Sequence, residues 1–317
     1  MPLHEFDVRP LEPADFDRVG EDYEVFVAFT KLGVITARIL DVYARRSEMP
    51  SQQVRPESIG FWRTLILTMT EDATTSILSS LKEWVNELPD SSRLYDPSRT
   101  RRVYRRDVYE IHICYFAMLI TFFHLCGQDF DSSSTNMVSL VASSCIAQLY
   151  EEIDFRDDVN YLMSPNNWYL MVACAPQLHY AGGEHDQDKS CTRDLNILVA
   201  VIQLMCLKWR GAKNILDTVL RLSTPSMESS LSPQLLACKP AAGKETGRRT
   251  PTVRLEHPHG LFPFPNSMCP RMNLLDRVVD LSWDANATQL APSTDEDLIS
   301  IFDVFGSNIF NMPIDSF

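Results

Sequence analysis

The spacing of the apolar residues restricts the fold of this chain more than any other feature of the sequence. Through most of residues 1–222, apolar side chains recur three and four positions apart, which places them on one face of a helix. Alternating apolar and polar runs long enough for a β-sheet are almost absent. The sequence therefore predicts an all-α fold, an irregular helical bundle. The apolar stripes run through Val25, Phe29, Leu32, Ile39 and Val42, through Trp62, Leu65, Ile66 and Met69, through Ile77, Leu81, Trp84, Val85 and Leu88, through Leu140, Val141, Cys145 and Leu149, and through Leu195, Leu198, Val199, Ile202, Met205, Cys206, Trp209, Leu216 and Leu220.

One helical stretch, residues 108–126, is apolar enough to resemble a membrane span. Its apolar run from Ile113 to Phe123 has eleven residues, whereas about 20 are needed to cross a bilayer. His112 and His124 stand on either side of that run. We therefore expect a central helix that is buried nearly all round, and no membrane partner.

Composition divides the chain into three parts. Residues 1–222 form the predicted helical domain. Residues 223–277 are expected to be a Pro- and Ser-rich linker with an extended or disordered backbone, because eight of the nineteen prolines fall within residues 223–270. Residues 278–317 contain seven acidic residues, five aromatic residues and neither Lys nor Arg, so they are predicted to form an acidic C-terminal tail.

A segment of this tail has the pattern of an activation segment. In a helix, Leu298, Ile301, Phe302 and Phe305 would share one face, because they are three and four residues apart. The acidic run over residues 295–297 would then lie at the helix start, where negative charge is favourable. We expect this segment to fold against a groove on a coactivator. The alternative is that it packs back on the bundle as a C-terminal helix.

Charge and motif content exclude several classes of function. The formal net charge of −13 argues against a direct grip on nucleic acid, because the phosphates would repel the chain. No two cysteines are closer than twelve residues, whereas zinc sites draw on pairs a few residues apart. The G-x-S-x-G, G-x-G-x-x-G, P-loop and H-E-x-x-H motifs are absent. We expect no catalytic residue, no cofactor and no metal, and we interpret the cysteines as reduced structural residues.

Clusters of metal-ligating residue types are interpreted as solvated segments. Residues 151–158, with the sequence EEIDFRDD, miss a D-D-x-x-D-type magnesium pattern because Phe155 occupies an acid position. A second cluster lies in a polar loop, where a solvated loop is favoured over a metal site. It contains His179, His185, Asp186, Asp188 and Cys191. His257 and His259 fall in the Pro-rich stretch, which we expect to leave their imidazoles without a fixed orientation.

Five arginines fall within eight residues, namely Arg99, Arg101, Arg102, Arg105 and Arg106. An exposed basic cluster is what a nuclear-import signal needs, so these residues are a candidate nuclear-import cluster. A solvated loop followed by a helix start explains the same residues equally well. The sequence leaves both interpretations open.

Four segments resemble the middle homology domain of fungal transcription factors that carry a six-cysteine binuclear zinc cluster. Residues 7–11 and 15–17 are similar to the acidic opening segment of that domain, and residues 26–46 to its long helix. Residues 84–89, WVNELP, resemble its W-x-x-x-L-P helix end, and residues 111–124 resemble its central helix with a His near each end. The resemblance covers residues 1 to about 222 and lies in the order and spacing of the motifs.

The resemblance implies a transcription regulator of fungal genes, such as those of a metabolic or biosynthetic cluster, located in the nucleus. The six-cysteine zinc cluster and the first half of the domain are not in this sequence, so DNA is expected to be reached only indirectly or through a zinc cluster missing from the N-terminus. Implied partners are a transcriptional coactivator or a full-length paralogue, with a homodimer or heterodimer as the assembly. The alternatives are an all-helical cytosolic enzyme of unrecognised class and an inactive truncated paralogue.

Overall fold

The computed structural model of the chain describes residues 21–47, 72–126, 130, 132–181, 189–223, 255 and 257–276. It contains helices α1 (Glu21–Ser47), α3 (Arg106–Cys126), α4 (Ser132–Phe155), α5 (Pro165–Ala181), α6 (Lys189–Met205) and α7 (Arg210–Ser223). Residues 72–86 form a further helix, and the 3-10 helices are η3 (Asp90–Ser92), η5 (Val159–Tyr161) and η7 (Pro258–Leu261). Within these residues there is no β-strand, which confirms the predicted all-α fold.

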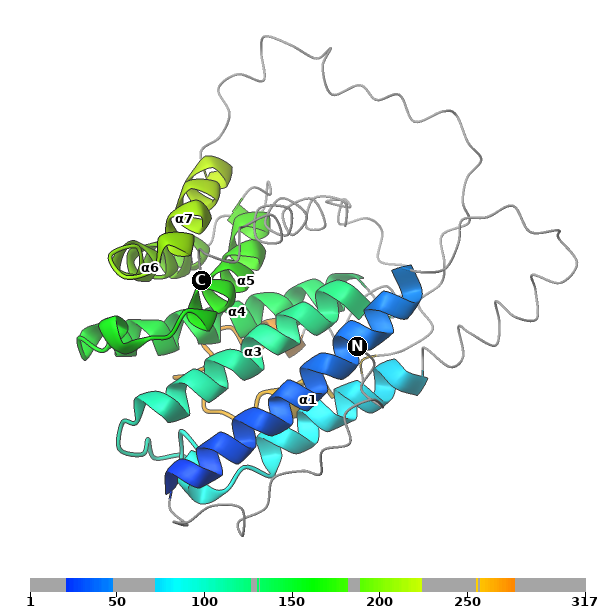
Figure 1. Cartoon of the computed structure of the whole chain (residues 1–317). Coiled ribbons are helices and arrows are strands. Elements are labelled where there is room, and N and C mark those ends of the chain that lie inside the picture. The colour runs from blue at the N-terminus through cyan, green and yellow to red at the C-terminus, as the bar shows by residue number, and fades with distance from the viewer. Residues whose placement is uncertain are drawn as a thin grey trace, which may run out of the picture.

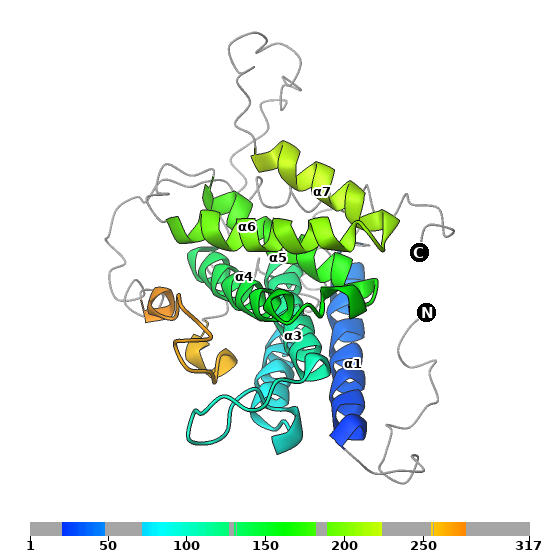
Figure 2. The same cartoon turned by 90° about the vertical axis from the view of Figure 1, so that its left-hand side faces the viewer.

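The helices are arranged around α3, which packs against α1, α4 and α5 (Figure 1). Figure 2 shows α3 and α4 between α1 on one side and a short segment coloured orange, near residue 265, on the other. Helices α6 and α7 lie together at one end of the molecule in both views. The core is therefore a set of helices that bury α3 from several directions.

The buried side of α1 follows a strict alternation of three- and four-residue steps. It consists of Val25, Ala28, Leu32, Ile35, Ile39 and Val42. The sequence pattern had placed Phe29 in this stripe, and that is wrong, because Phe29 is 43% exposed and Ala28 takes its place. The helix over 72–86 is joined to α1 by Arg38, whose guanidinium donates to the hydroxyls of Ser76 and Ser80 at 2.9 and 3.0 Å.

Helix α3 is the only helix of the described residues whose length and composition would suit a membrane span. Of its most apolar window, 78% is buried inside the protein. Core helices of ordinary globular proteins pass the same length and composition test, and this degree of burial matches the central helix predicted from the sequence.

The long apolar stripe from Leu195 to Leu220 is divided between two helices. Helix α6 ends at Met205 and α7 begins at Arg210, with a tight turn between them. Lys208 N–H donates to the carbonyl of Met205 at 3.0 Å, a three-residue spacing that closes the last turn. The side chain of Trp209 donates to the carbonyl of Leu162 at 3.2 Å, which holds the turn against the segment before α5.

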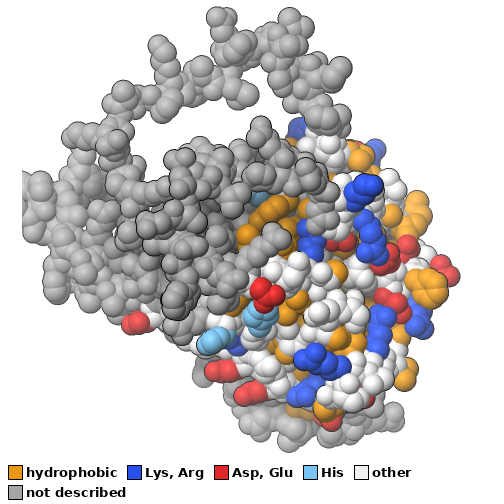
Figure 3. Space-filling view, turned by 180° about the vertical axis from the view of Figure 1, so that it is seen from behind, with side chains coloured by type: hydrophobic (Ala, Val, Ile, Leu, Met, Phe, Trp, Pro, Cys, Tyr) orange, Lys and Arg blue, Asp and Glu red, His pale blue; other side chains and the backbone are white. Residues whose placement is uncertain are grey.

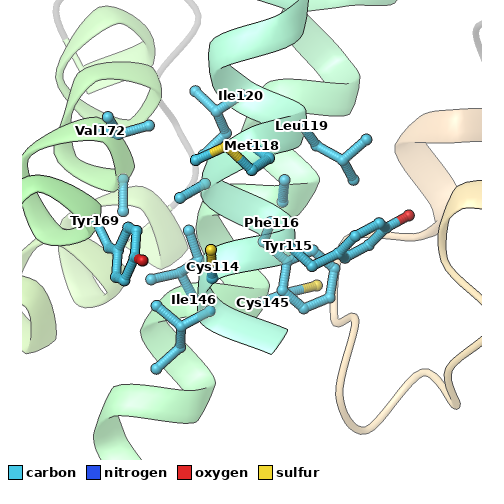
Figure 4. Close-up of a cluster of buried hydrophobic side chains, with 14 of the residues drawn as sticks. Cys114, Tyr115, Phe116, Met118, Leu119, Ile120, Cys145, Ile146, Tyr169 and Val172 are labelled. Atoms are coloured by element: carbon cyan, nitrogen blue, oxygen red, sulfur yellow. The ribbon is translucent and has the colours of Figure 1, made fainter. Parts of the chain in front are cut away.

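Residues 257–276, which we name the strap, pack against the helices. The linker expected over residues 223–277 is therefore wrong for this part, while residues 224–254 lie outside the described residues. The strap's backbone turns through η7 and a series of hydrogen-bonded turns, and several of its side chains are buried in the common core. Those side chains belong to Leu261, Phe262, Met268, Cys269 and Leu275. Tyr115 points from α3 toward the strap and donates its hydroxyl to the carbonyl of Leu261 at 2.8 Å (Figure 4).

Candidate functional site

Three of the segments that resemble the fungal domain, residues 26–46, 84–89 and 111–124, contact one another in the core. The indole N–H of Trp84 donates to the carbonyl of Ala28 in α1 at 2.8 Å. The ring of Trp84 stacks on Tyr115 of α3, with centroids 5.2 Å apart and an interplanar angle of 14°. His112 of α3 contacts Trp84 and Phe264 edge-on, at centroid distances of 6.2 and 5.7 Å. We name Trp84, His112, Tyr115 and Phe264 the aromatic junction.

Local sequence explains how these side chains reach one another. His112 and Tyr115 are three residues apart on α3, so they project from neighbouring positions of one face. Trp84 lies in the last turn of the helix over 72–86, and Pro89 follows soon after the end of that helix. The chain therefore turns away directly beyond Trp84 and leaves its ring inserted between α1 and α3.

His112 is a neutral imidazole in this environment. Its side chain is almost fully buried, and burial lowers its pKa from 6.5 to about 4. Nδ1 lies 2.8 Å from the carbonyl oxygen of Val108, which can only accept a hydrogen bond. Nδ1 therefore carries the proton and Nε2 is left as an acceptor.

A cavity of about 200 Å³ opens beside the aromatic junction. It lies between the end of the helix over 72–86, the loop that follows it, and the strap. The lining consists of Val85, Asn86, Leu88, Arg93, Leu94, Tyr95, Asp96, Pro97, Arg99, His112, Pro263, Phe264 and Pro265. No Ser, Thr, Cys or Lys stands among these described lining residues, and the hydroxyl in this lining belongs to Tyr95.

The polar residues around this cavity have mainly structural contacts. Arg93 donates from Nε to the carbonyl of Leu88 at 2.7 Å, which satisfies a carbonyl beyond the end of the preceding helix. Asp96 accepts from the Ser98 hydroxyl at 2.6 Å and the Thr100 amide at 2.8 Å, and these hydrogen bonds lower its pKa. The volume of about 200 Å³ is large enough for a small polar molecule.

The arginines of the candidate nuclear-import cluster lie at the loop before α3 and at the start of that helix. Four of them have a carboxylate oxygen within 3.6 Å. The pairs are Arg101 with Glu152, Arg102 with Asp90, Arg105 with Asp107, and Arg106 with Glu110. Arg99 is exposed and has a left-handed backbone with φ of 63°. On the face shown in Figure 3, basic and acidic side chains of the described residues are interspersed.

The acidic run at residues 151–158 covers the end of α4, up to Phe155, and the turn that follows it. Phe155, the last helical residue, is 80% exposed. Glu152 accepts two hydrogen bonds from Arg156, at 3.2 and 3.0 Å, and Asp158 accepts one from the Tyr104 hydroxyl at 2.7 Å. These carboxylates therefore have partners within the chain.

The described residues contain no group of three or more His, Cys, Asp or Glu side chains placed to hold a metal ion. His179 lies near the end of α5 and Cys191 lies in α6, while residues 182–188 are outside the described part. His259 has a definite orientation, contrary to expectation, because its Nε2 lies 3.0 Å from a carboxylate oxygen of Asp276.

The candidate activation segment, Leu298, Ile301, Phe302 and Phe305, lies outside the described residues. Its helix and its apolar face therefore stay predictions.

A buried polar cluster joins α4, α6 and the strap. Arg271 of the strap donates from Nη1 to the sulfur of Cys191 at 3.0 Å, and its Nη2 lies 3.7 Å from Oδ2 of Asp194. Both charged side chains are at least nine-tenths buried. Burial raises the pKa of Asp194, while a hydrogen bond from Ser144 and the Arg271 charge oppose that rise. A buried ion pair of this kind fixes the position of the strap more than it adds to stability.

Comparison of the chain with models of protein families, with curated proteins and with solved structures finds no match in any of the three. The family resemblance therefore rests on the sequence motifs alone.

Sequence reasoning did not foresee the buried polar cluster or the strap. Arg271 follows a Pro-rich stretch whose composition is typical of an extended chain, and its partners are about 80 residues earlier in the sequence. The one available signal was the apolar run Leu261, Phe262 and Phe264 between prolines, which is unusual for a solvated linker.

Proposed function

We propose that the chain is a regulatory module of transcription, not an enzyme, in which a helical domain controls an acidic activation tail. The observation that supports this most directly is the aromatic junction. The motifs that carry the resemblance at Trp84, His112 and Tyr115 are brought together in the core, where each has a packing role. A fold shared with the resembling domain would bring these motifs into contact, and this agreement is what supports the proposal.

The partner surface that we propose lies on the outer side of α1. Phe26, Phe29, Leu40 and Tyr43 are 43–51% exposed there, and they are spaced so that they share one side of the helix. An apolar helix side of this length is suited to a second helical domain, and we propose a second copy of this chain or a full-length paralogue.

Light scattering of the full chain tests this surface. We expect a dimer at tens of micromolar, and we expect Leu40→Lys to give a monomer. Val103→Lys changes an apolar loop residue that is 89% exposed and distant in sequence from α1, so it should leave the dimer intact. A monomer in the unsubstituted chain would argue against the α1 surface.

A reporter assay tests the proposed activity. The full chain is fused to a heterologous DNA-binding domain, and reporter expression is expected to rise. Phe302→Ala combined with Phe305→Ala should abolish that rise, because both side chains belong to the predicted apolar face. Phe310→Ala combined with Phe317→Ala removes two other aromatics of the tail and serves as the matched control.

Two outcomes of this assay would contradict the proposal. A fusion that does not raise reporter expression would refute the proposed activation function. Equal activity of the two double variants would show that tail composition, not the helix face, matters. Cellular location is tested separately with a fluorescent fusion, which we expect in the nucleus.

The proposed route to DNA is indirect, through a partner or a zinc cluster that is not in this sequence. The net charge of −13 supports this, because a protein that neutralises phosphates needs an excess of basic residues. A gel-shift with the purified chain should show no sequence-selective binding at physiological salt, and selective binding would overturn this part of the proposal.

A further inference from the structure

Two cysteine sulfurs from distant parts of the chain lie in contact. The Sγ atoms of Cys145 in α4 and Cys269 in the strap are 3.0 Å apart, although 124 residues separate them in sequence. Both side chains are fully buried. Cys145 lies beside Tyr115 (Figure 4), and burial together with both thiols raises the pKa of that tyrosine. No disulfide joins any two cysteines of the described residues.

Residues of the strap before and after Cys269 in the sequence fix the position of this cysteine. Before it, Leu261 accepts the Tyr115 hydroxyl and the ring of Phe262 stacks on Phe116, with centroids 5.9 Å apart. After it, Arg271 is anchored by its contacts with α6. The strap therefore holds the Cys269 sulfur against α4 without help from a covalent bond.

The distance is short enough for a covalent bond to form with little rearrangement. A disulfide joins its sulfurs at about 2.05 Å, so an approach of about 1 Å is needed. Because Cys145 lies within a regular helix, we expect the strap to supply that movement. In the reduced state burial keeps Cys145 protonated, since it raises the pKa of this thiol well above its ordinary value.

We propose that Cys145 and Cys269 form a reversible disulfide when the chain meets a peroxide, and that this bond locks the strap onto α4. This inference does not rest on the proposed role in transcription. It identifies an oxidation site in which two thiols lose two electrons and two protons while hydrogen peroxide is reduced to two molecules of water.

The order of steps follows from the elements that carry the two cysteines. The strap consists of turns and one short 3-10 helix, so local opening exposes Cys269 while Cys145 stays within α4. The Cys269 thiolate attacks one peroxide oxygen, the O–O bond breaks, and the departing hydroxide takes up a proton. The resulting sulfenic acid returns to its place, the Cys145 sulfur attacks the Cys269 sulfur and loses its proton, and the S–O bond breaks to release water.

Peptide mapping of the full chain tests the inference. The reduced protein is treated with hydrogen peroxide, the remaining thiols are alkylated after unfolding, and an unreduced digest is analysed by mass spectrometry. We expect a peptide pair that joins Cys145 to Cys269 as the main cross-link, lost on treatment with dithiothreitol. Because the bond tethers the strap across a long loop, proteolytic cleavage within residues 257–276 should slow roughly tenfold.

Substitutions provide the controls. Cys269→Ala should remove both the cross-link and the protection from protease. Cys174→Ser, at a fully buried cysteine of α5, should retain both. The mapping of the unsubstituted chain decides the question even if Cys269→Ala does not fold.

Two results would overturn the inference. The first is recovery of Cys145 and Cys269 as alkylated thiols from the folded chain at a peroxide concentration that oxidises an exposed cysteine peptide. The second is a main cross-link between Cys269 and Cys191, which would show that the arginine contact in α6 selects the partner.

Discussion

His112 should make the stability of the chain fall as the pH is lowered. Its folded-state pKa is depressed by burial, so between pH 6.5 and about 4 the unfolded chain binds a proton that the folded chain does not. The stability that the neutral imidazole supports is therefore complete above pH 6.5 and is lost as the pH falls toward 4. The difference between the unfolded and folded pKa values corresponds to a total change of about 3 kcal/mol in the free energy of unfolding. About 2 kcal/mol of this should be lost between pH 7 and pH 5.

The assay is urea unfolding followed by circular dichroism at a series of pH values. Glu110 and Asp194 act in the opposite sense, because burial raises their pKa values and lowering the pH then favours the folded chain. The comparison with His112→Gln isolates the histidine, since both carboxyl groups remain in the variant. The variant should lose about 2 kcal/mol less than the unsubstituted chain between pH 7 and pH 5.

Phe155→Ala, at an exposed position with no titratable group, is the matched control and should show the same loss as the unsubstituted chain. Equal pH dependence in His112→Gln and the unsubstituted chain would refute the reasoning. It would mean that His112 is protonated in the folded state and that the aromatic junction has an arrangement different from the one described.

Three further substitutions test the packing around α3. Trp84→Ala should lower the free energy of unfolding by about 3–5 kcal/mol, against less than about 0.5 kcal/mol for the exposed Phe155→Ala, both measured by urea unfolding. Tyr115→Phe leaves the buried carbonyl of Leu261 without this donor, so it should cost about 1–2 kcal/mol and speed proteolysis of the strap. Arg101→Ala removes the ion pair with Glu152. Because the Arg101 side chain is 46% exposed, the free energy of unfolding should fall by less than about 1 kcal/mol, measured by urea unfolding.

Much of the helical core could be predicted from the sequence because the spacing of apolar residues is a local property. Helix α3 is the clearest case, since its apolar residues extend all round and only a position inside other helices can bury them. The stripe from Ile77 to Leu88 is buried as predicted. Periodicity was less reliable at Phe29, where the neighbouring Ala28 lies on the buried face instead, and at the turn that separates α6 from α7.

Tertiary structure alone decided which distant groups meet. Whether a basic cluster is a free patch depends on carboxylates elsewhere in the chain, and Arg101 meets Glu152 from 51 residues away. The strap has no helical periodicity, and its place is set by contacts such as those of Tyr115 with Leu261 and of Cys145 with Cys269. Such contacts join residues more than 100 positions apart, so they leave no repeating pattern in the local sequence. The chain's own sequence determined its helices, whereas the burial of charges and thiols was determined only when those helices packed.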